Sequence, residues 1–253
     1  MNIKQINQNN NSLLFSLLLV SLLFNRTVMA SVDDNIDQND GSLSGEFPHI
    51  PEPMVFDLVR PLGTTKGEFE INNLSRYNNQ GHFDWAPEIE YAIHDGLAIE
   101  LELPFSYSNL EEIKMATQWT LPDSSHHFIH GLQAIGRYVI KEASYSADFL
   151  YIAGYRFNEK WSTLNMLGLR TEDISKRTKL QGLTNLNLFY NLGENIVVGV
   201  EMNNEFNKKK WHLNAVPQLH FNLSDNLSVQ TGAGSSFNKH KQWSINGRLI
   251  YAF

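Results

Sequence analysis

Residues Trp243 to Phe253 read WSINGRLIYAF, and their polarity alternates up to the end of the sequence. Every second residue counted back from Phe253 is apolar or small, whereas most of the residues between them are polar. A period of two is typical of a β-strand whose two faces meet different surroundings, because successive side chains point to opposite sides. The stretch therefore predicts a strand with one apolar and one polar face.

The same alternation continues through most of the chain from Gly67 onward. It is clearest in FDWAPEIEYAI (Phe83–Ile93), LAIELELPFSY (Leu97–Tyr107) and WHLNAVPQLHFNL (Trp211–Leu223). In the second of these segments the odd-numbered residues are all apolar or aromatic, and Glu100 and Glu102 lie between them. We therefore expect an all-β protein in which each strand has one apolar face.

Short connections between the strands make the pattern more specific. Four of them consist of three turn residues between two apolar residues, namely HDG at 94–96, NEK at 158–160, GEN at 193–195 and SDN at 224–226. A three-residue loop keeps both flanking residues on the same face, so each hairpin preserves the phase of the alternation. Strands are expected near residues 67–77, 83–93, 97–108, 112–121, 127–139, 145–157, 161–170, 179–192, 196–206, 211–223, 227–237 and 242–253.

The number of strands decides where these turns lie. Residues 112–121 have the weakest strand pattern, and without them HDG and NEK would lie at opposite ends of the sheet. With them there are twelve strands, and all four tight turns lie at one end. An even number of strands with both termini on one side is what a bacterial transmembrane barrel requires. The predicted fold is a twelve-stranded antiparallel transmembrane β-barrel of the outer-membrane type.

Aromatic residues mark two levels along the predicted strands. One group lies near the longer, basic loops, as Trp211 does, and the other lies near the tight turns, as Phe221 does. The ten residues between these two span roughly 33 Å along a strand, or about 25 Å vertically at a tilt near 40°. This distance matches the apolar band of an outer membrane. A soluble protein with two sheets is the alternative, but paired aromatic belts are harder to explain in such a protein.

The N-terminal part of the chain differs from the rest. Residues 1–30 contain Lys4, an apolar run from Leu13 to Phe24 and a small residue at Ala30, which together predict a cleaved secretory signal peptide. Residues 31–65 are rich in Asp, Asn, Ser, Gly and Pro and predict a mostly irregular periplasmic segment, with a short strand at Met54–Val59. The barrel is expected to comprise residues 66–253.

Charge and cysteine content narrow the classes of protein. Residues 31–253 contain 18 basic and 27 acidic residues, a net charge of −9, without an acidic block that would indicate a particular partner. An exported chain with no cysteine must be held together by its own packing or by a membrane. We expect no nucleic-acid partner and no cofactor.

The final strand resembles the terminal signature of Gram-negative outer-membrane barrels, which ends in Phe. This resemblance implies that the barrel-assembly machinery recognises the strand ending at Phe253 and that the protein lies in the cell outer membrane. Closing the last strand onto the first also removes the sheet edges, which lipid would not tolerate. Membrane lipids are then the expected surroundings, and basic loop residues such as Lys208 and Lys210 would contact lipopolysaccharide phosphates or simply remain solvated.

The stretch WAPEIEYAIHDGLAIELELPF (Trp85–Phe105) resembles a hairpin of a bacterial outer-membrane β-barrel family. Members of that family are often labelled as transporters of the meta-pathway of phenol degradation. The segment GYRFNEKWS (Gly154–Ser162), the following GLR and the final YAF are similar as well. The resemblance implies a channel that takes up small solutes, including aromatic or hydrophobic compounds, and it assigns no functional residue.

Acidic residues gather on the polar faces of the first three strands. If HDG centres its hairpin on Asp95, then Glu90 faces Glu100 and Glu88 faces Glu102. If the preceding loop is centred near residue 80, Glu70 lies beside Glu90, and Glu68 extends the patch. Like charges paired across a ladder are destabilising, so these carboxylates must be protonated, bound to a cation or matched by basic groups.

Arginines supply the basic groups in this prediction. Arg137, Arg156, Arg170 and Arg248 fall on the inward face, and Arg248 would lie beside the first strand. One interpretation is a constriction with acidic groups on one wall and guanidinium groups on the other, which would filter solutes by charge. The other is a lumen filled by Glu–Arg pairs that conducts nothing. The N-terminal segment could also occupy the lumen. The predicted pore-lining residues are Glu68, Glu70, Glu88, Glu90, Glu100, Glu102, Arg137, Arg156 and Arg248.

Catalytic and metal sites receive less support. His212 and His220 share a face but lie about 26 Å apart along a strand, too far for one metal ion, and the spacing of His126, His127 and His130 does not favour a metal site. Some twelve-stranded barrels are lipid hydrolases, but neither His-x-Ser nor Gly-x-Ser-x-Gly occurs in the chain. We expect no catalytic residue and no metal. A lipid-modifying hydrolase and a structural barrel remain the alternatives to a channel.

Overall fold

The computed structural model describes residues 48–56, 58–122, 126–174, 179–207, 211–237 and 242–253, so the predicted signal peptide lies outside the described residues. Within these ranges there is no helix long and apolar enough to cross a membrane. The described residues form the strands β1 (Phe69–Asn78), β2 (Phe83–His94), β3 (Leu97–Glu102), β4 (Phe105–Ser106), β5 (Asn109–Leu110), β6 (Glu112–Leu121), β7 (Phe128–Val139), β8 (Ser144–Arg156), β9 (Trp161–Glu172), β10 (Lys179–Asn191), β11 (Ile196–Phe206), β12 (Trp211–Asn222), β13 (Leu227–Phe237) and β14 (Gln242–Ala252).

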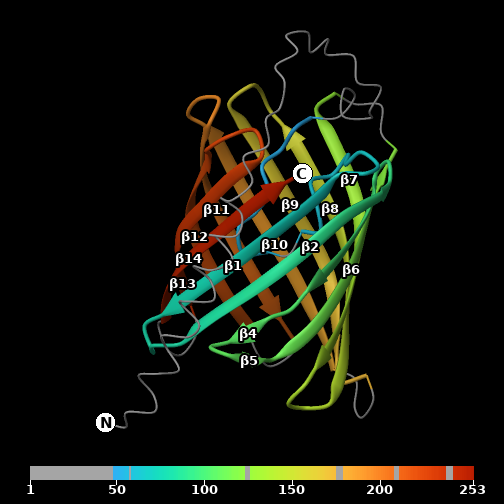
Figure 1. Cartoon of the computed structure of the whole chain (residues 1–253), viewed down its shortest axis with the longest axis vertical. Coiled ribbons are helices and arrows are strands. Elements are labelled where there is room, and N and C mark those ends of the chain that lie inside the picture. The colour runs from blue at the N-terminus through green and yellow to red at the C-terminus, as the bar shows by residue number, and fades with distance from the viewer. Residues whose placement is uncertain (1–47, 57, 123–125, 175–178, 208–210, 238–241) are drawn as a thin grey trace.

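Twelve of these strands close into an antiparallel barrel, as the sequence predicts. Each long strand pairs with its neighbours in the chain, and β14 pairs with β1, so that Arg248 lies opposite Leu74. The strands are inclined to the long axis of the barrel (Figure 1). The short strands β4 and β5 form a small hairpin between β3 and β6, and β4 pairs with the beginning of β2. Within the described part of the chain, the closed ladder leaves no long strand with an unpaired edge.

The predicted register is also confirmed. Glu90 pairs with Glu100 and Glu88 with Glu102 between β2 and β3, and Glu70 pairs with Glu90 between β1 and β2. The register follows from the turns, because a turn of known length and centre fixes which residues of the two strands lie opposite each other. Gly96 has a φ of 71° in the first tight turn, a conformation that glycine adopts without steric cost.

The two ends of the barrel differ. The tight turns lie at the same end as the first and last residues of the barrel, where the Phe253 amide donates to the Phe69 carbonyl at 2.9 Å and the Asn226 side chain donates to the Ala252 carbonyl at 2.9 Å. We call this the turn end. The opposite end, where β1 meets β2 and β7 meets β8, is called the loop end.

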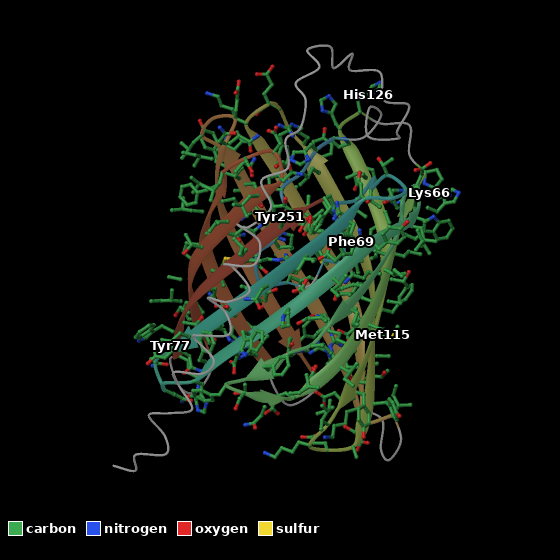
Figure 2. The ribbon with its side chains drawn as sticks, in the orientation of Figure 1. Lys66, Phe69, Tyr77, Met115, His126 and Tyr251 are labelled. Atoms are coloured by element: carbon green, nitrogen blue, oxygen red, sulfur yellow. The ribbon has the colours of Figure 1, made fainter. Side chains whose placement is uncertain are left out.

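The outer surface is apolar, as expected for a wall in contact with lipid. Figure 2 shows Tyr77 and Met115 on the outside of the barrel, and their exposed fractions are 49% and 65%. Aromatic rings meet near both ends. Tyr138 and Tyr145 lie at the loop end with ring centres 5.0 Å apart, and other pairs lie at the turn end, such as Trp161–Tyr190 and Tyr251–Phe253. Many large apolar side chains of the strands, such as Leu167 and Leu169, are exposed between these two aromatic levels.

The structure departs from the predicted elements in two places. The strand expected at 97–108 is interrupted after Glu102, because Pro104 has no amide hydrogen to donate to the ladder. The chain then turns through Tyr107, whose φ is 54°, and the indole of Trp85 donates to the Tyr107 carbonyl at 2.8 Å. The short strand expected at Met54–Val59 is not formed by the described residues of that range: residues 54–56 and 59 lie in bends, and the Met54 and Phe56 amides donate to Glu201 of the barrel.

The lipid-facing surface can be tested by placing a charge on it. Leu167 lies near the middle of β9 with an exposed fraction of 60%, so a Leu167→Arg substitution should lower the free energy of unfolding by about 2–4 kcal/mol in lipid vesicles. The matched control is Leu192→Arg, in a tight turn, with a nearly equal exposed fraction of 61% and an expected cost of about 0–1 kcal/mol. Denaturant titration measures both values. Equal losses at the two positions would show that the middle of β9 does not face lipid.

Candidate functional site in the barrel lumen

The inward side chains form two walls of different character. The acidic wall consists of buried carboxylates on β1, β2 and β3, namely Glu70, Glu88, Glu90, Glu100 and Glu102. The apolar wall consists of buried side chains on β7, β8, β9 and β10, namely Ile129, Leu150, Ile152, Leu164, Met166 and Phe189. The acidic wall follows the sequence prediction, whereas inward-facing apolar side chains were not predicted. They result from stretches such as Phe149–Ile152, where apolar residues occupy both faces of the strand.

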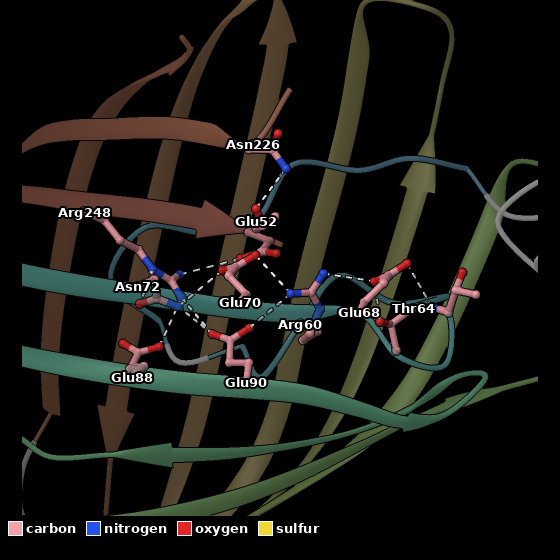
Figure 3. A network of polar contacts seen from close by, with 12 residues as sticks. Glu52, Arg60, Thr64, Glu68, Glu70, Asn72, Glu88, Glu90, Asn226 and Arg248 are labelled. Carbon is pink, nitrogen blue, oxygen red and sulfur yellow. Dashed lines mark hydrogen bonds and ion pairs between the residues drawn. The ribbon is translucent and has the colours of Figure 1, made fainter. Parts of the chain in front are cut away.

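Arg248 is the main basic partner of the acidic wall. It lies on β14 beside β1, as predicted, and its side chain is 3% exposed. Its guanidinium lies 3.2 Å from Glu88 and 3.5 Å from Glu90, and it donates to Asn72 at 3.2 Å (Figure 3). Because a buried charge is tolerated only when it is paired and hydrogen-bonded, this arginine makes the crowding of carboxylates on β1 and β2 possible.

Lys114 is the second basic partner, and the sequence analysis did not single it out. It lies on β6 opposite Glu102, contacts that carboxylate directly, and approaches Glu100 to 3.8 Å. The available signal was the alternation along β6. The even-numbered residues of this strand face the lumen, and Lys114 is one of them. The pairing spreads positive charge to the β3 side of the acidic wall.

The remaining predicted arginines lie on β7, β8 and β9 and have other partners. Arg137 and Arg170 share Asp148, with nitrogen–oxygen distances of 2.8 and 2.9 Å, and Arg170 also reaches Glu205 at 2.9 Å. Arg156 donates to the backbone carbonyls of His49 and Glu159 at the turn end. The geometry therefore differs from the simple picture of one acidic wall facing one arginine wall.

A segment that precedes the barrel lies inside it. We call the described residues between 48 and 65 the lumenal segment. Its tip is held by Glu201 on β11, whose buried carboxylate accepts backbone N–H groups of Met54 at 3.0 Å, Val55 at 2.9 Å and Phe56 at 2.6 Å. The same carboxylate accepts from the Asn185 and Asn203 side chains at 3.1 and 2.8 Å. The sequence analysis did not identify this interaction, because it depends on a backbone path that has no strand periodicity.

The returning arm of the lumenal segment is bound to the acidic wall through Arg60. Its guanidinium lies 2.9 Å from Glu68, 3.1 Å from Glu70 and 4.0 Å from Glu90 (Figure 3). The Gln118 side chain donates to the Arg60 carbonyl at 2.6 Å, and the Gly63 amide donates to the Thr120 hydroxyl at 2.8 Å. These contacts fix the arm against β1, β2 and β6.

The opposite side of the lumenal segment packs on the apolar wall. Ile50, Leu58 and Val59 belong to one buried cluster with the residues of that wall, and Leu58 and Val59 are 1% and 0% exposed. The segment thus matches both walls at once, with Arg60 on the acidic side and aliphatic groups on the apolar side. Burial of each aliphatic side chain contributes about 1.5–3 kcal/mol relative to exposure.

Glu52 lies where the lumenal segment meets the arginine of the acidic wall. Its carboxylate is 3.7 Å from Arg248. Burial, with a further contribution from the nearby Glu70, raises the pKa of Glu52 to about 7, and the opposing attraction of Arg248 and Arg60 does not cancel this effect. Glu52 therefore takes up a proton near neutral pH when the segment is docked.

Cavities lie on both sides of the lumenal segment. A cavity of about 210 Å³ at the loop end is lined by Val55 and Phe56 of the segment and by side chains such as Arg137, Arg170 and His212. A second cavity of about 400 Å³ at the turn end is lined by His49 to Glu52 of the segment and by wall residues that include His220. The two histidines that share a face on β12 therefore lie in different cavities.

Metal binding was not predicted, and the described residues contain one group of carboxylates close enough to consider. One oxygen each from Glu88, Glu90 and Glu100 lies within 4.8 Å of the others. Arg248 and Lys114 already approach this group. His130 and His127 were considered for a metal site. His130 has its Nδ1 3.0 Å from the Tyr151 hydroxyl, and His127 contacts the Arg156 carbonyl through Nδ1 at 3.0 Å.

Comparisons with known proteins agree with the barrel. A family model described as HAEPLYID-like matches residues 47–252. No curated protein sequence matches the chain. Similar solved structures include the KdgM porin in complex with disordered oligogalacturonate (TM-score 0.62, 10% identity, 73% of this chain and 99% of that one) and the NanC porin (0.60, 6%, 72% and 98%).

A third similar structure is the COG4313 outer membrane channel from Pseudomonas putida F1, with a TM-score of 0.59, 11% identity and coverage of 76% of this chain and 97% of that chain. At such identities the similarity establishes the barrel fold alone. The predicted resemblance to an outer-membrane barrel family is confirmed at this level, whereas the label of a phenol meta-pathway transporter is not.

The central role of Arg248 predicts a large effect on stability. Arg248→Gln should lower the free energy of unfolding by about 3–5 kcal/mol, because it leaves Glu88 and Glu90 buried without their guanidinium partner. Arg76→Gln is the control, since Arg76 is half exposed and its ion pair with Asp84 should contribute about 0–1 kcal/mol. Denaturant titration in detergent micelles measures both. A loss below about 1 kcal/mol for Arg248→Gln would contradict the role assigned to this arginine.

Proposed function

The chain belongs to the HAEPLYID-like family, and we propose that it is a channel of the bacterial outer membrane through which small solutes move passively. The observation that carries the proposal is the arrangement of the lumen, in which a cavity opens on each side of the lumenal segment. The segment contributes no strand to the barrel ladder. Its displacement would join the two cavities without breaking any pairing between strands.

The contacts of the lumenal segment support a role as a displaceable plug. Its tip is held by hydrogen bonds to Glu201, and its returning arm is held by the ion pairs of Arg60. Hydrogen bonds and ion pairs can exchange with water, and the net contribution of each hydrogen bond is about 0.5–1.5 kcal/mol. On the barrel side, the tip of the plug is therefore held mainly by Glu201, and the Met54 amide also donates to the Gln218 side chain at 3.1 Å.

The proposal includes the expected surroundings of the barrel. An outer-membrane location, contacts with lipid and lipopolysaccharide, and recognition of the strand ending at Phe253 by the assembly machinery are all consistent with the apolar band and the terminal aromatic pair. Three structures with similar folds are described as porins or as an outer membrane channel. For the transported solute, aromatic or hydrophobic compounds remain a prediction from the sequence resemblance, and the apolar wall is compatible with them.

A filled, structural barrel is the second candidate function. The observation that favours it is the depth of burial of the lumenal segment, where Met54, Leu58 and Val59 are at most 1% exposed. If these residues formed a permanent core, the lumen would never conduct. A lipid-modifying hydrolase is less favoured, because the sequence contains neither His-x-Ser nor Gly-x-Ser-x-Gly.

Single-channel conductance in a planar bilayer distinguishes the two candidates. We expect small or rare currents from the wild-type protein and frequent stepwise currents from Glu201→Gln, because the neutral amide binds the three N–H groups of the tip more weakly. Glu194→Gln, at an exposed position in a tight turn, should behave as the wild type. A variant lacking residues 31–65 should conduct without closing.

Folding of each variant is checked by heat-modifiable migration in detergent gels, which reports the closed barrel independently of current. Correctly folded Glu201→Gln and truncated proteins that pass no current would overturn the channel and favour the structural barrel. If open events were equally frequent in the wild type and in Glu201→Gln, the lumenal segment would not act as a plug held by Glu201.

Conductance should also depend on pH through Glu52. The pKa of this carboxyl is raised from 4.5 to about 7 when the lumenal segment is docked, so the docked state binds an extra proton between these values. The added stability of the docked state is fully present below about pH 4.5 and is lost as the pH rises through about 7. We expect open events to be more frequent at pH 8 than at pH 5. Glu52→Gln should reduce this difference, and an undiminished difference would show that other groups control it.

A further inference from the structure

We propose that Leu58, Val59 and Arg60 occupy a solute-binding site of the channel, and that this site takes a small amphipathic cation with an aliphatic or aromatic body and an amine or guanidine head. The inference rests on the proposed function, because a solute reaches the site only when the lumenal segment moves away. These three residues fill the site when the lumenal segment is docked. Their side chains therefore indicate which kind of solute the site would bind.

The two walls explain why the occupant is amphipathic. Leu58 and Val59 lie in the buried cluster formed with Ile129, Ile152 and Leu164 of the apolar wall. The next residue, Arg60, places its guanidinium against the acidic wall, with Glu70 at 3.1 Å and Glu90 at 4.0 Å. A solute that fills the same space needs an apolar body on one side and a hydrogen-bond-donating head on the other.

The charge of the acidic wall explains why the head is cationic. Among the described residues, its five buried carboxylates face Lys114 and Arg248 on the neighbouring strands, and the lumenal segment supplies Arg60 as the third cation. When the segment leaves, it removes Arg60 from a wall in which Glu70, Glu90 and Glu100 stand side by side on three strands. Crowded carboxylates favour the return of a positive charge over a neutral or negative group.

Glu90 gives a second indication that the acidic wall can bind a cationic head group more closely than it binds Arg60. Its side chain is 0% exposed, and no hydrogen-bond donor among the described residues reaches its Oε2 atom. Arg60 approaches that oxygen only to 4.0 Å. Because a buried carboxylate oxygen without a donor is costly, a cation that can come closer than Arg60 would gain a contact that the lumenal segment does not make.

The spacing of Leu58, Val59 and Arg60 indicates how far the cationic head of the solute lies from its apolar body. Arg60 directly follows Val59 and lies two residues after Leu58, so the apolar groups start within roughly 3–7 Å of the head-group residue along the backbone. The proposed site takes small solutes, since the space that it offers is the one filled by three residues of the lumenal segment, Leu58, Val59 and Arg60. Alkylguanidinium and benzylguanidinium ions have these features, and they differ from each other only in the apolar body.

The test uses the full-length chain with Leu58→Ala, Val59→Ala and Arg60→Ala together, which vacates both the apolar position and the head-group position. Isothermal titration calorimetry in detergent measures the binding of n-butylguanidinium and benzylguanidinium. We expect binding at least tenfold tighter than for guanidinium alone, and at least tenfold tighter than for n-pentanol and benzyl alcohol, which lack the charge. Adding Glu90→Gln should weaken binding about tenfold, whereas adding Glu194→Gln should not change it.

Wild-type protein serves as the competition control, because its own Arg60 occupies the position and should weaken binding at least tenfold. Heat-modifiable migration confirms that each variant is folded, and Arg60→Lys provides a second variant that keeps the charge and should bind as weakly as the wild type. Equal affinity for charged and neutral probes would overturn the proposal. So would tight binding of guanidinium or Ca²⁺ alone with no gain from an apolar body, which would indicate a site for simple cations.

These outcomes are distinguishable from failure of the proposed function, since binding in detergent does not require current. Binding of the amphipathic cations without conductance in any variant would contradict the channel and leave the site in place. Conductance without preferential binding of these cations would leave the channel and remove the site.

Discussion

A chain that crosses a lipid bilayer must pair its backbone N–H and C=O groups within the protein, because lipid offers no partners. Strands satisfy this requirement only when the sheet has no free edge, so the pairing of β1 with β14 is the interaction on which the rest of the structure depends. Closure fixes the even number of strands and directs alternate side chains to lipid and to the lumen. The polar residues of each strand are thereby gathered into one enclosed space.

That enclosed space creates a second constraint, which the lumenal segment resolves. Carboxylates from three adjacent strands meet in the lumen, and their crowding is stable only with cationic partners. Arg248 and Lys114 come from the barrel itself, whereas Arg60 comes from the segment that precedes β1. The segment therefore compensates the charge of one wall while its aliphatic residues cover the other wall. Its position follows from these complementary surfaces, without any contribution to the strand ladder.

Much of the barrel could be predicted from the sequence because two local rules determine it. The period of two assigns each residue to a face, and turns of known centre assign opposite residues, which is why the pairing of Glu70 with Glu90 and of Glu90 with Glu100 could be predicted. The break after Glu102 was missed because the proline effect was not weighed against the strong alternation before it. The contacts of Arg60 with the acidic wall and of Glu201 with the tip could not be predicted from the sequence. Both depend on the path of an irregular segment through the lumen. The apolar wall was not predicted, because the alternation was taken to separate lipid-facing apolar residues from water-facing polar residues. Part of the lumen is filled by apolar side chains of the lumenal segment, which favour apolar residues on the inward face as well.

The covalent link between the lumenal segment and β1 has a kinetic and thermodynamic consequence. Only Lys66, Gly67 and Glu68 connect the lumenal segment to the first strand, so rebinding of a displaced segment would be an intramolecular event. A short tether corresponds to an effective concentration in the millimolar range. If the protein acts as the proposed channel, any solute that enters the lumen must compete with the tethered segment at that effective concentration. Transport would then require that the contacts of the segment are individually weak. In the proposed channel, the local concentration set by three connecting residues would limit how long the lumen stays open and how much solute is needed to keep it open.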